Sequence, residues 1–125
     1  MDLRREEMAN GPVITGFAGR GFRVGERVFP GGLLIDPGGV ADWDAPADVE
    51  GLEVAALGGL LDLEPAPEFL LLGTGRILIQ PPRAFVGALE ARGIGVEAMD
   101  SRAAARAWGV LRLEERRVVG ALMPL

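Results

Sequence analysis

The chain has 125 residues, and 13 basic against 18 acidic residues give it a net charge of −5. With 49% hydrophobic and 25% charged residues it has the composition of a soluble globular protein. Its length fits one compact domain. An acidic surface repels phosphate backbones, which argues against nucleic-acid binding and against attachment to anionic lipid. No apolar run reaches the roughly 20 residues that cross a bilayer, and the amino terminus resembles neither a signal peptide nor a transit peptide. We therefore expect a cytoplasmic protein without direct membrane insertion.

Several reactive residue types are absent from the chain. It contains no Cys, His, Lys or Tyr, its only serine is Ser101, and its only threonines are Thr15 and Thr74. Cys-His and Ser-His nucleophilic catalysis, a Cys/His zinc site, a Schiff-base lysine and a Walker A loop are thereby excluded. Carboxylates, arginines, three hydroxyls and backbone amides remain. We expect no metal and no cofactor, and the inventory favours a protein that is not an enzyme.

The first part of the chain is rich in strand patterns. Residues 1–11 are expected to form a flexible tail. The segments that follow predict a strand over 12–19 and a hairpin over 21–29 that turns at Gly25-Glu26. They also predict a short strand over 31–39, closed by a Pro-Gly turn, and an edge strand over 40–46.

The second part alternates between strands and helices. Helical spacing predicts a short amphipathic helix over 51–63, although Gly58-Gly59 argues against it. The later segments predict a central strand over 68–73, a helix over 83–93 and a second central strand over 94–99. A helix over 101–109, capped by Asp100, follows, and residues 110–125 predict a terminal hairpin around Glu115-Arg116 whose last strand is central.

This order of elements predicts a single α/β domain over residues 12–125. We expect a central mixed sheet with its helices on one face and the N-terminal strands packed elsewhere on it.

The motif Gly73-Thr74-Gly75 ends the first central strand and has two interpretations. The glycines allow backbone amides to approach an anion, with Thr74 adding a hydroxyl. Alternatively, they relieve crowding where the strand leaves the sheet. The second interpretation is favoured, because the residues "RILIQ" separate the motif from the next helix. The N-terminal amides of that helix therefore lie too far along the chain to point at the loop.

The segment "MDSRAAAR" carries the second candidate site. Asp100 is explained as a helix cap, and Arg102 and Arg106 share one helix face, where they require solvent, carboxylates or an external anion. If the strands 68–73 and 94–99 are neighbours, then Thr74, Asp100, Ser101 and Arg102 line one crevice at the carboxyl edge of the sheet.

Two tryptophans are candidates for another role. Trp43 and Trp108 are most simply packing anchors, but an exposed tryptophan would indicate a surface for a partner.

Three stretches of the sequence carry a resemblance to a known family. They are "ITGFAGRGFRVGERVFPGGLLIDPGGVADW", "FLLLGTG" and "LEARGIGVEAMDSRAAARAWGVLRLEERRVVGALMPL". Together they resemble the Mth938-like family (DUF498/DUF598), whose members include small prokaryotic proteins and a mitochondrial complex I assembly factor. The resemblance runs from about residue 12 to the end of the chain. Many relatives carry a Cys and an aromatic-Asn pair in the helix that here has Ala105, Ala107, Trp108 and Gly109, so no role of that thiol carries over.

The resemblance implies a three-layer β/β/α fold and no defining reaction or cofactor. It favours a non-catalytic protein-interaction domain, and it implies an assembly factor for a complex I-like respiratory complex or another membrane assembly, in a prokaryotic cytoplasm. The alternative is a small-anion-binding protein or enzyme that uses the crevice at Thr74, Asp100, Ser101 and Arg102. A third hypothesis is a regulatory subunit in a homo-oligomer, where a neighbouring copy completes the site.

Overall fold

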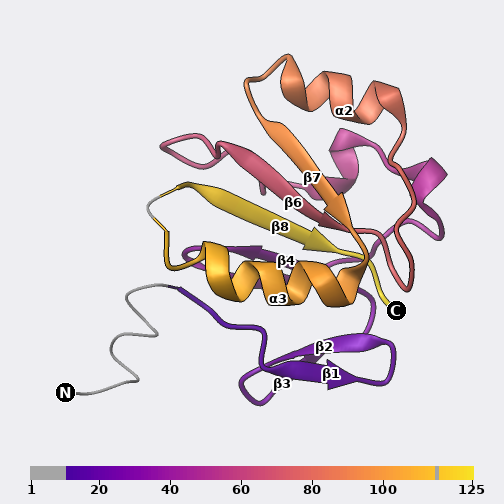
Figure 1. The fold of residues 1–125 in the computed structure, drawn as a ribbon, viewed down its shortest axis with the longest axis vertical. Helices are drawn as coiled ribbons and strands as arrows, with labels where there is room; N and C mark the ends of the chain where they lie inside the picture. The colour runs from indigo at the N-terminus through magenta and orange to yellow at the C-terminus, as the bar shows by residue number, and fades with distance from the viewer. Residues whose placement is uncertain (1–10, 115) are drawn as a thin grey trace.

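The computed structural model describes residues 11–114 and 116–125. The expected tail therefore lies outside the described residues except for Gly11, which is buried. A small antiparallel sheet contains β1 (Gly16–Ala18), β2 (Gly21–Val24) and β3 (Arg27–Phe29). A five-stranded mixed sheet has the order β5-β4-β8-β6-β7, made from β4 (Leu33–Asp36), β5 (Gly39–Asp42), β6 (Phe69–Gly73), β7 (Gly95–Met99) and β8 (Val118–Leu122). Two helices complete the fold, α2 (Arg83–Glu90) and α3 (Ser101–Leu111) (Figure 1).

The path of the chain across the larger sheet sets the positions of the two helices. It leaves β6 through α2 to reach β7 on one side, and then returns through α3 to reach β8 on the other side of β6. Both connections join parallel strands, and such crossovers are right-handed. Because they run in opposite directions, α2 and α3 lie on opposite faces of the sheet.

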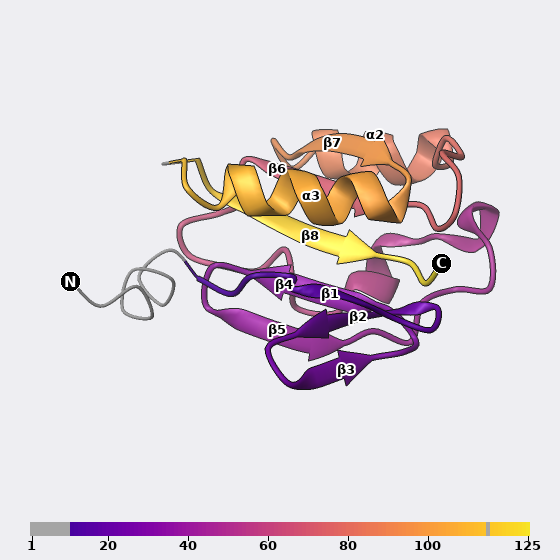
Figure 2. The ribbon, with the colours of Figure 1, turned by 60° about the horizontal axis from the view of Figure 1, so that its bottom comes forward.

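This arrangement confirms the α/β fold with a central mixed sheet, but the prediction that both helices share one face is wrong. The small sheet β1–β3 lies at the end of the molecule away from α2 (Figures 1 and 2).

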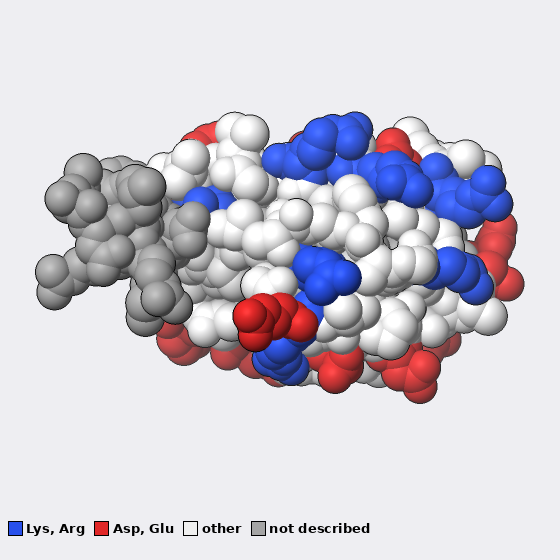
Figure 3. Space-filling view, turned by 90° about the horizontal axis from the view of Figure 1, so that it is seen from below, with Lys and Arg blue, Asp and Glu red and all other residues white. Residues whose placement is uncertain are grey.

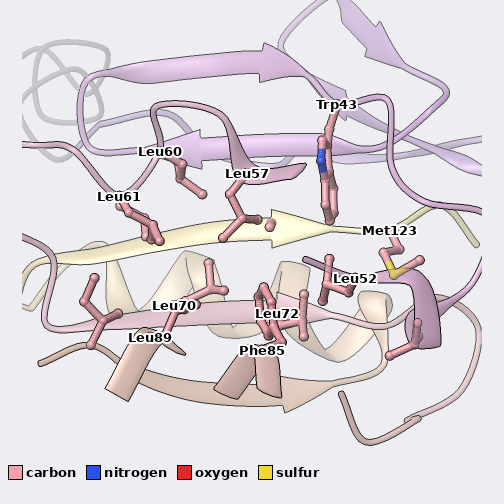
Figure 4. Close-up of a cluster of buried hydrophobic side chains, with 14 residues drawn as sticks. Trp43, Leu52, Leu57, Leu60, Leu61, Leu70, Leu72, Phe85, Leu89 and Met123 are labelled. Atoms are coloured by element: carbon pink, nitrogen blue, oxygen red, sulfur yellow. The ribbon is translucent and has the colours of Figure 1, made fainter. Parts of the chain in front are cut away.

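The buried strand β6 divides its side chains between two cores. Leu70 and Leu72 point into a core with Phe85 and Leu89 of α2. This core also contains Trp43 and the leucines of the segment 52–61 (Figure 4). The alternation of side chains along a strand therefore links β6 to α2 on one face.

The opposite face of β6 contributes to the second core. Phe69 and Leu71 pack there with Trp108 of α3 and with Phe22 and Phe29 of the small sheet. The continuous apolar run of β6 thus reports burial on both faces, as expected of a central strand in a sheet with parallel neighbours.

Several local predictions are confirmed. The β2–β3 hairpin turns at Gly25-Glu26, with Val24 paired to Arg27. Gly25 has a φ of 61°, as the first central residue of a type II′ turn requires. The β4–β5 hairpin turns at Pro37-Gly38, and β5 is an edge strand.

The predicted helix over 51–63 is wrong. The structure has two 3₁₀ turns in this region, η1 (Val49–Gly51) and η2 (Val54–Leu57). Gly58 follows with a φ of 57°, which ends the second turn. Leu52, Leu57, Leu60 and Leu61 are nevertheless buried, so the apolar spacing reported burial and not α-helix.

Two predictions about the second half of the chain are also wrong. β7 is an edge strand and not a central one, and its Gly95 and Glu97 are exposed. The segment "VLRLEE" does not form a hairpin strand, because α3 continues through Val110 to Leu111. The expected turn includes Glu115, which lies outside the described residues. The last strand, β8, is central as predicted, but a crossover leads to it.

A pair of glycine substitutions tests this packing. An alanine Cβ at Gly120 of β8 would lie 2.7 Å from Cγ2 of Ile35, whereas one at Gly87 of α2 would meet nothing within 4 Å. Gly120→Ala should lower the free energy of unfolding by about 1–3 kcal/mol through overpacking. Gly87→Ala should raise it by about 0.5–1 kcal/mol through helix propensity. Urea denaturation measures both, and equal effects would contradict the assigned faces.

Candidate functional site

The two crossovers leave the sheet from the carboxyl ends of β6 and β7, which are neighbouring strands. Gly73 at the end of β6 pairs with Met99 of β7 on one side and with Leu122 of β8 on the other. Connections that leave adjacent strand ends for opposite faces open a crevice, and open α/β sheets bind ligands at such switch points. The predicted neighbourhood of the strands 68–73 and 94–99 is confirmed.

A groove of about 460 Å³ lies at this edge of the sheet. We call it the edge groove. It is lined by Thr74–Ile77 and Ile79 from the loop after β6, by the segment Met123–Leu125 after β8, by residues 46–49, and by Arg20.

Thr74 shapes the loop that follows β6. Its side chain is buried, and its hydroxyl lies 2.7 Å from the carbonyl oxygen of Ile77 and 3.2 Å from that of Met99. The same oxygen accepts a hydrogen bond from the backbone N–H of Ile79 at 3.1 Å. The threonine thus holds the loop 74–79 in a tight turn, and its hydroxyl is already engaged by backbone groups.

Ser101 joins three segments of the chain. It is fully buried, and its hydroxyl accepts from the N–H of Gly75 at 2.8 Å and donates to the carbonyl of Met123 at 2.7 Å. The N–H of Ser101 in turn donates to the carbonyl of Gly75. An added Cβ at Gly73 would lie 2.7 Å from the serine oxygen, so glycine is required there by close packing. These contacts support the interpretation of Gly73-Thr74-Gly75 as a tight strand exit.

The other predicted site residues lie at the start of α3. Asp100 caps the helix, with its Oδ1 accepting from the N–H of Ala103 at 2.9 Å, as predicted. Arg102 and Arg106 are exposed, and the guanidinium of Arg102 lies 5.1 Å from the centre of the Phe17 ring. Thr74, Asp100 and Ser101 are therefore brought together, but their oxygens bond to backbone groups. In the described ranges, no cluster of acidic residues has the arrangement of a metal site.

Neither tryptophan forms part of a surface. Trp43 and Trp108 are 3% and 1% exposed. Their indole N–H groups donate to the carbonyls of Ala56 at 2.8 Å and Pro12 at 2.9 Å. The suggested partner surface at these two residues is therefore wrong, because both rings anchor the two cores.

Sequence reasoning missed an exposed apolar segment beside the edge groove. Ile77, Leu78 and Ile79 have exposed fractions of 65%, 50% and 36%. We call these three residues the apolar loop. In the sequence they count only as a spacer before the next helix. The signal lay in three consecutive aliphatic residues followed by Gln80 and two prolines, a composition that suits neither a helix interior nor a paired strand.

Arginines surround the groove on an otherwise acidic protein. Arg20 and Arg76 line it, and the Nε of Arg20 donates to the main-chain oxygen of Leu125 at 2.5 Å. Arg102 follows Ser101, which is bonded to Gly75. Basic side chains gather along one side of the molecule, above a broad uncharged area (Figure 3). Within the part of the chain that the structure describes, no helix is long and apolar enough to cross a membrane.

Removal of the Ser101 hydroxyl tests its structural role. Ser101→Ala leaves the buried N–H of Gly75 and carbonyl of Met123 without their side-chain partner, which should lower the free energy of unfolding by about 2–4 kcal/mol. Arg106→Ala, on the exposed face of the same helix, should change it by less than about 0.5 kcal/mol. Chemical denaturation of both variants measures the difference. An unaffected Ser101→Ala protein would show that the bridge is dispensable.

Comparisons with known proteins agree with this architecture. A family model described as "Protein of unknown function (DUF498/DUF598)" matches residues 14–123. An uncharacterised protein of Rhodobacter capsulatus is 35% identical over 125 residues, which cover 100% of this chain and 94% of the relative. The Danio rerio protein named NADH dehydrogenase [ubiquinone] 1 alpha subcomplex assembly factor 3 is 28% identical over 124 residues, covering 99% of this chain and 71% of that protein.

Solved structures show the same fold. A crystal structure of a Bordetella parapertussis protein is 38% identical, has a TM-score of 0.77, and is matched over 91% of this chain and 96% of that chain. A solution NMR structure from Bordetella pertussis, described as a Mth938-like domain, is 30% identical with a TM-score of 0.80, over 99% and 92% of the two chains. On the evidence of its sequence and its fold, the chain belongs to the DUF498/DUF598 family and has a Mth938-like fold.

Proposed function

We propose that this protein is a non-catalytic interaction domain that acts in the prokaryotic cytoplasm as an assembly factor for a complex I-like respiratory complex or another membrane assembly. The apolar loop is the observation that carries the proposal. Ile77 and Leu78 are at least half exposed, next to a groove on the edge of the sheet. Contiguous exposed aliphatic surface beside a groove marks sites where proteins bind one another.

The interior of the site supports binding by a protein surface over catalysis. The hydroxyls of Thr74 and Ser101 are buried in hydrogen bonds to the backbone. A small ligand that used either hydroxyl would have to replace a bond that holds the loop in place. A partner that packs on Ile77 and Leu78 requires no such change.

The similarity to a named assembly factor supports the role in assembly. The Danio rerio relative carries that name and aligns with nearly the whole of this chain. An assembly factor binds intermediates and releases them, and a loop on a rigid sheet edge is suited to such reversible contacts. We extend the role to this chain as part of the proposal.

A matched pair of variants tests the role of the apolar loop. Leu78 and Leu113 are 50% and 62% exposed, but Leu113 lies beyond the far end of α3, at the amino edge of the sheet. Tagged wild-type protein and Leu113→Glu should enrich respiratory-complex or membrane-assembly subunits after mild crosslinking in native cells. Leu78→Glu should lose them, because a carboxylate would have to be buried at the contact.

Quantitative mass spectrometry against a tag-only sample provides the readout. Equal enrichment by Leu78→Glu and wild type would remove the loop from the interface, and a wild-type sample without such subunits would contradict the assembly role itself.

A ligand titration separates the proposal from the anion-binding alternative. We expect inorganic phosphate at constant ionic strength to leave the melting temperature unchanged. An anion site would give about 2.7 kcal/mol of stabilisation at a ligand concentration of about 100 times Kd, a rise of several degrees. A rise that Arg102→Ala abolishes would support the anion site and count against our proposal.

A further inference from the structure

We infer that the edge groove binds a partner segment that combines aliphatic side chains with Asp or Glu residues. This inference rests on the proposed function and specifies the chemistry of the partner. It follows from two independent features of the site, which are the concave apolar surface and the arginines around it.

The apolar part of the groove is concave. Ile77 and Ile79 line it from the loop, Val49 lines it from η1, and Met123 and Pro124 line it after β8. A volume of about 460 Å³ accommodates several aliphatic side chains. Apolar side chains that insert into a bilayer protrude from the protein surface, whereas a recess between chain segments fits the side chains of a peptide. The shape therefore favours a protein segment over a lipid surface.

The charge around the groove favours carboxylates. Arg20 and Arg76 line it, and the Nε of Arg20 already donates to the main-chain oxygen of Leu125. Asp48 is the acidic side chain among the described lining residues, and its Oδ1 accepts from the N–H of Gly51 at 3.0 Å. Arg76 is exposed and forms no ion pair with any residue in the described ranges. Its guanidinium is free to make a charge-assisted hydrogen bond to a carboxylate of a partner.

The first turns of α3 extend this basic surface. Arg102 and Arg106 are exposed one helical turn apart, and α3 contains no acidic residue. Because Ser101 is bonded to Gly75, Arg102 and Arg76 each lie one residue from this junction. Figure 3 shows basic side chains collected along one side of the molecule.

The distribution of charge along the chain sharpens the contrast. Residues 28–75 contain no basic residue and nine acidic residues, which are Asp36, Asp42, Asp44, Asp48, Glu50, Glu53, Asp62, Glu64 and Glu68. An acidic partner is repelled by these carboxylates, of which Asp48 lies on one wall of the groove, and is attracted to Arg20 and Arg76 on its other walls. Complementarity of this kind determines where and how fast a partner docks.

A peptide selection identifies the preferred chemistry even while the partner is unidentified. Random peptides displayed on phage are selected on the full chain, and enriched sequences are synthesised for fluorescence anisotropy. We expect a consensus with aliphatic residues beside Asp or Glu. Binding should be lost in Ile77→Glu, which places a carboxylate in the lining of the groove, and should weaken about tenfold in Arg76→Glu. Added salt should weaken the binding of the wild type more steeply than that of Arg76→Glu.

Two control variants lie at the opposite edge of the sheet. Leu113→Glu matches the loop substitution, and Arg92→Glu matches the charge reversal. Arg92 follows α2 and forms an exposed ion pair with Asp62 at 3.0 Å, whose loss should cost little stability. Both controls should bind the selected peptides as the wild type does. Circular dichroism and thermal melts of all four variants verify that each one is folded.

The outcomes separate this inference from the proposed function. Neutral or basic peptides that require Ile77 but are indifferent to Arg76→Glu would overturn the acidic partner and leave an interaction domain in place. Peptides that ignore Ile77→Glu, or a selection that enriches none, would overturn the groove as a peptide site. Binding only to phosphatidylcholine–phosphatidylglycerol vesicles would overturn it in favour of a membrane surface.

Discussion

The burial of β6 on both faces is the constraint on which the rest of the structure depends. Leu70 and Leu72 require cover on one face of the sheet, and Phe69 and Leu71 require it on the other. Two right-handed crossovers that leave in opposite directions supply α2 to the first face and α3 to the second. Because β6 and β8 are paired, the loop after β6 and the segment after β8 lie beside each other, and with residues 46–49 and Arg20 they line the edge groove.

The polar residues at this edge and the apolar loop have complementary roles. The hydroxyls of Thr74 and Ser101 bond to backbone groups of the loop and of the segment after β8. These hydrogen bonds fix the loop in a conformation that leaves Ile77 and Leu78 exposed to solvent. Residues that sequence reasoning treated as candidate ligand contacts are thus the scaffold, and the neighbouring aliphatic residues form the surface that we propose for a partner.

Much of the fold could be predicted from local patterns, because strand alternation, Pro-Gly turns and the Asp100 cap act over a few residues. The helix faces required the strand order, which no local pattern contains. The prediction of a helix over residues 51–63 was wrong because buried leucines at helical spacing also suit two 3₁₀ turns separated by extended backbone. At the site, the meeting of Thr74 with Ser101 was predictable from parallel strands, but the exposure of Ile77 was not, since it depends on how Thr74 pins the loop.

Site-specific photo-crosslinking tests the central claim most directly, namely that the apolar loop contacts a protein partner. A photoreactive phenylalanine analogue is placed at Leu78 or, for comparison, at Leu113, and living cells of the native host are irradiated. Both positions are exposed, so random encounters label them alike. The account predicts a discrete adduct from position 78, identified as a subunit of a respiratory or other membrane complex, and none from position 113. Identical labelling from the two positions would contradict it.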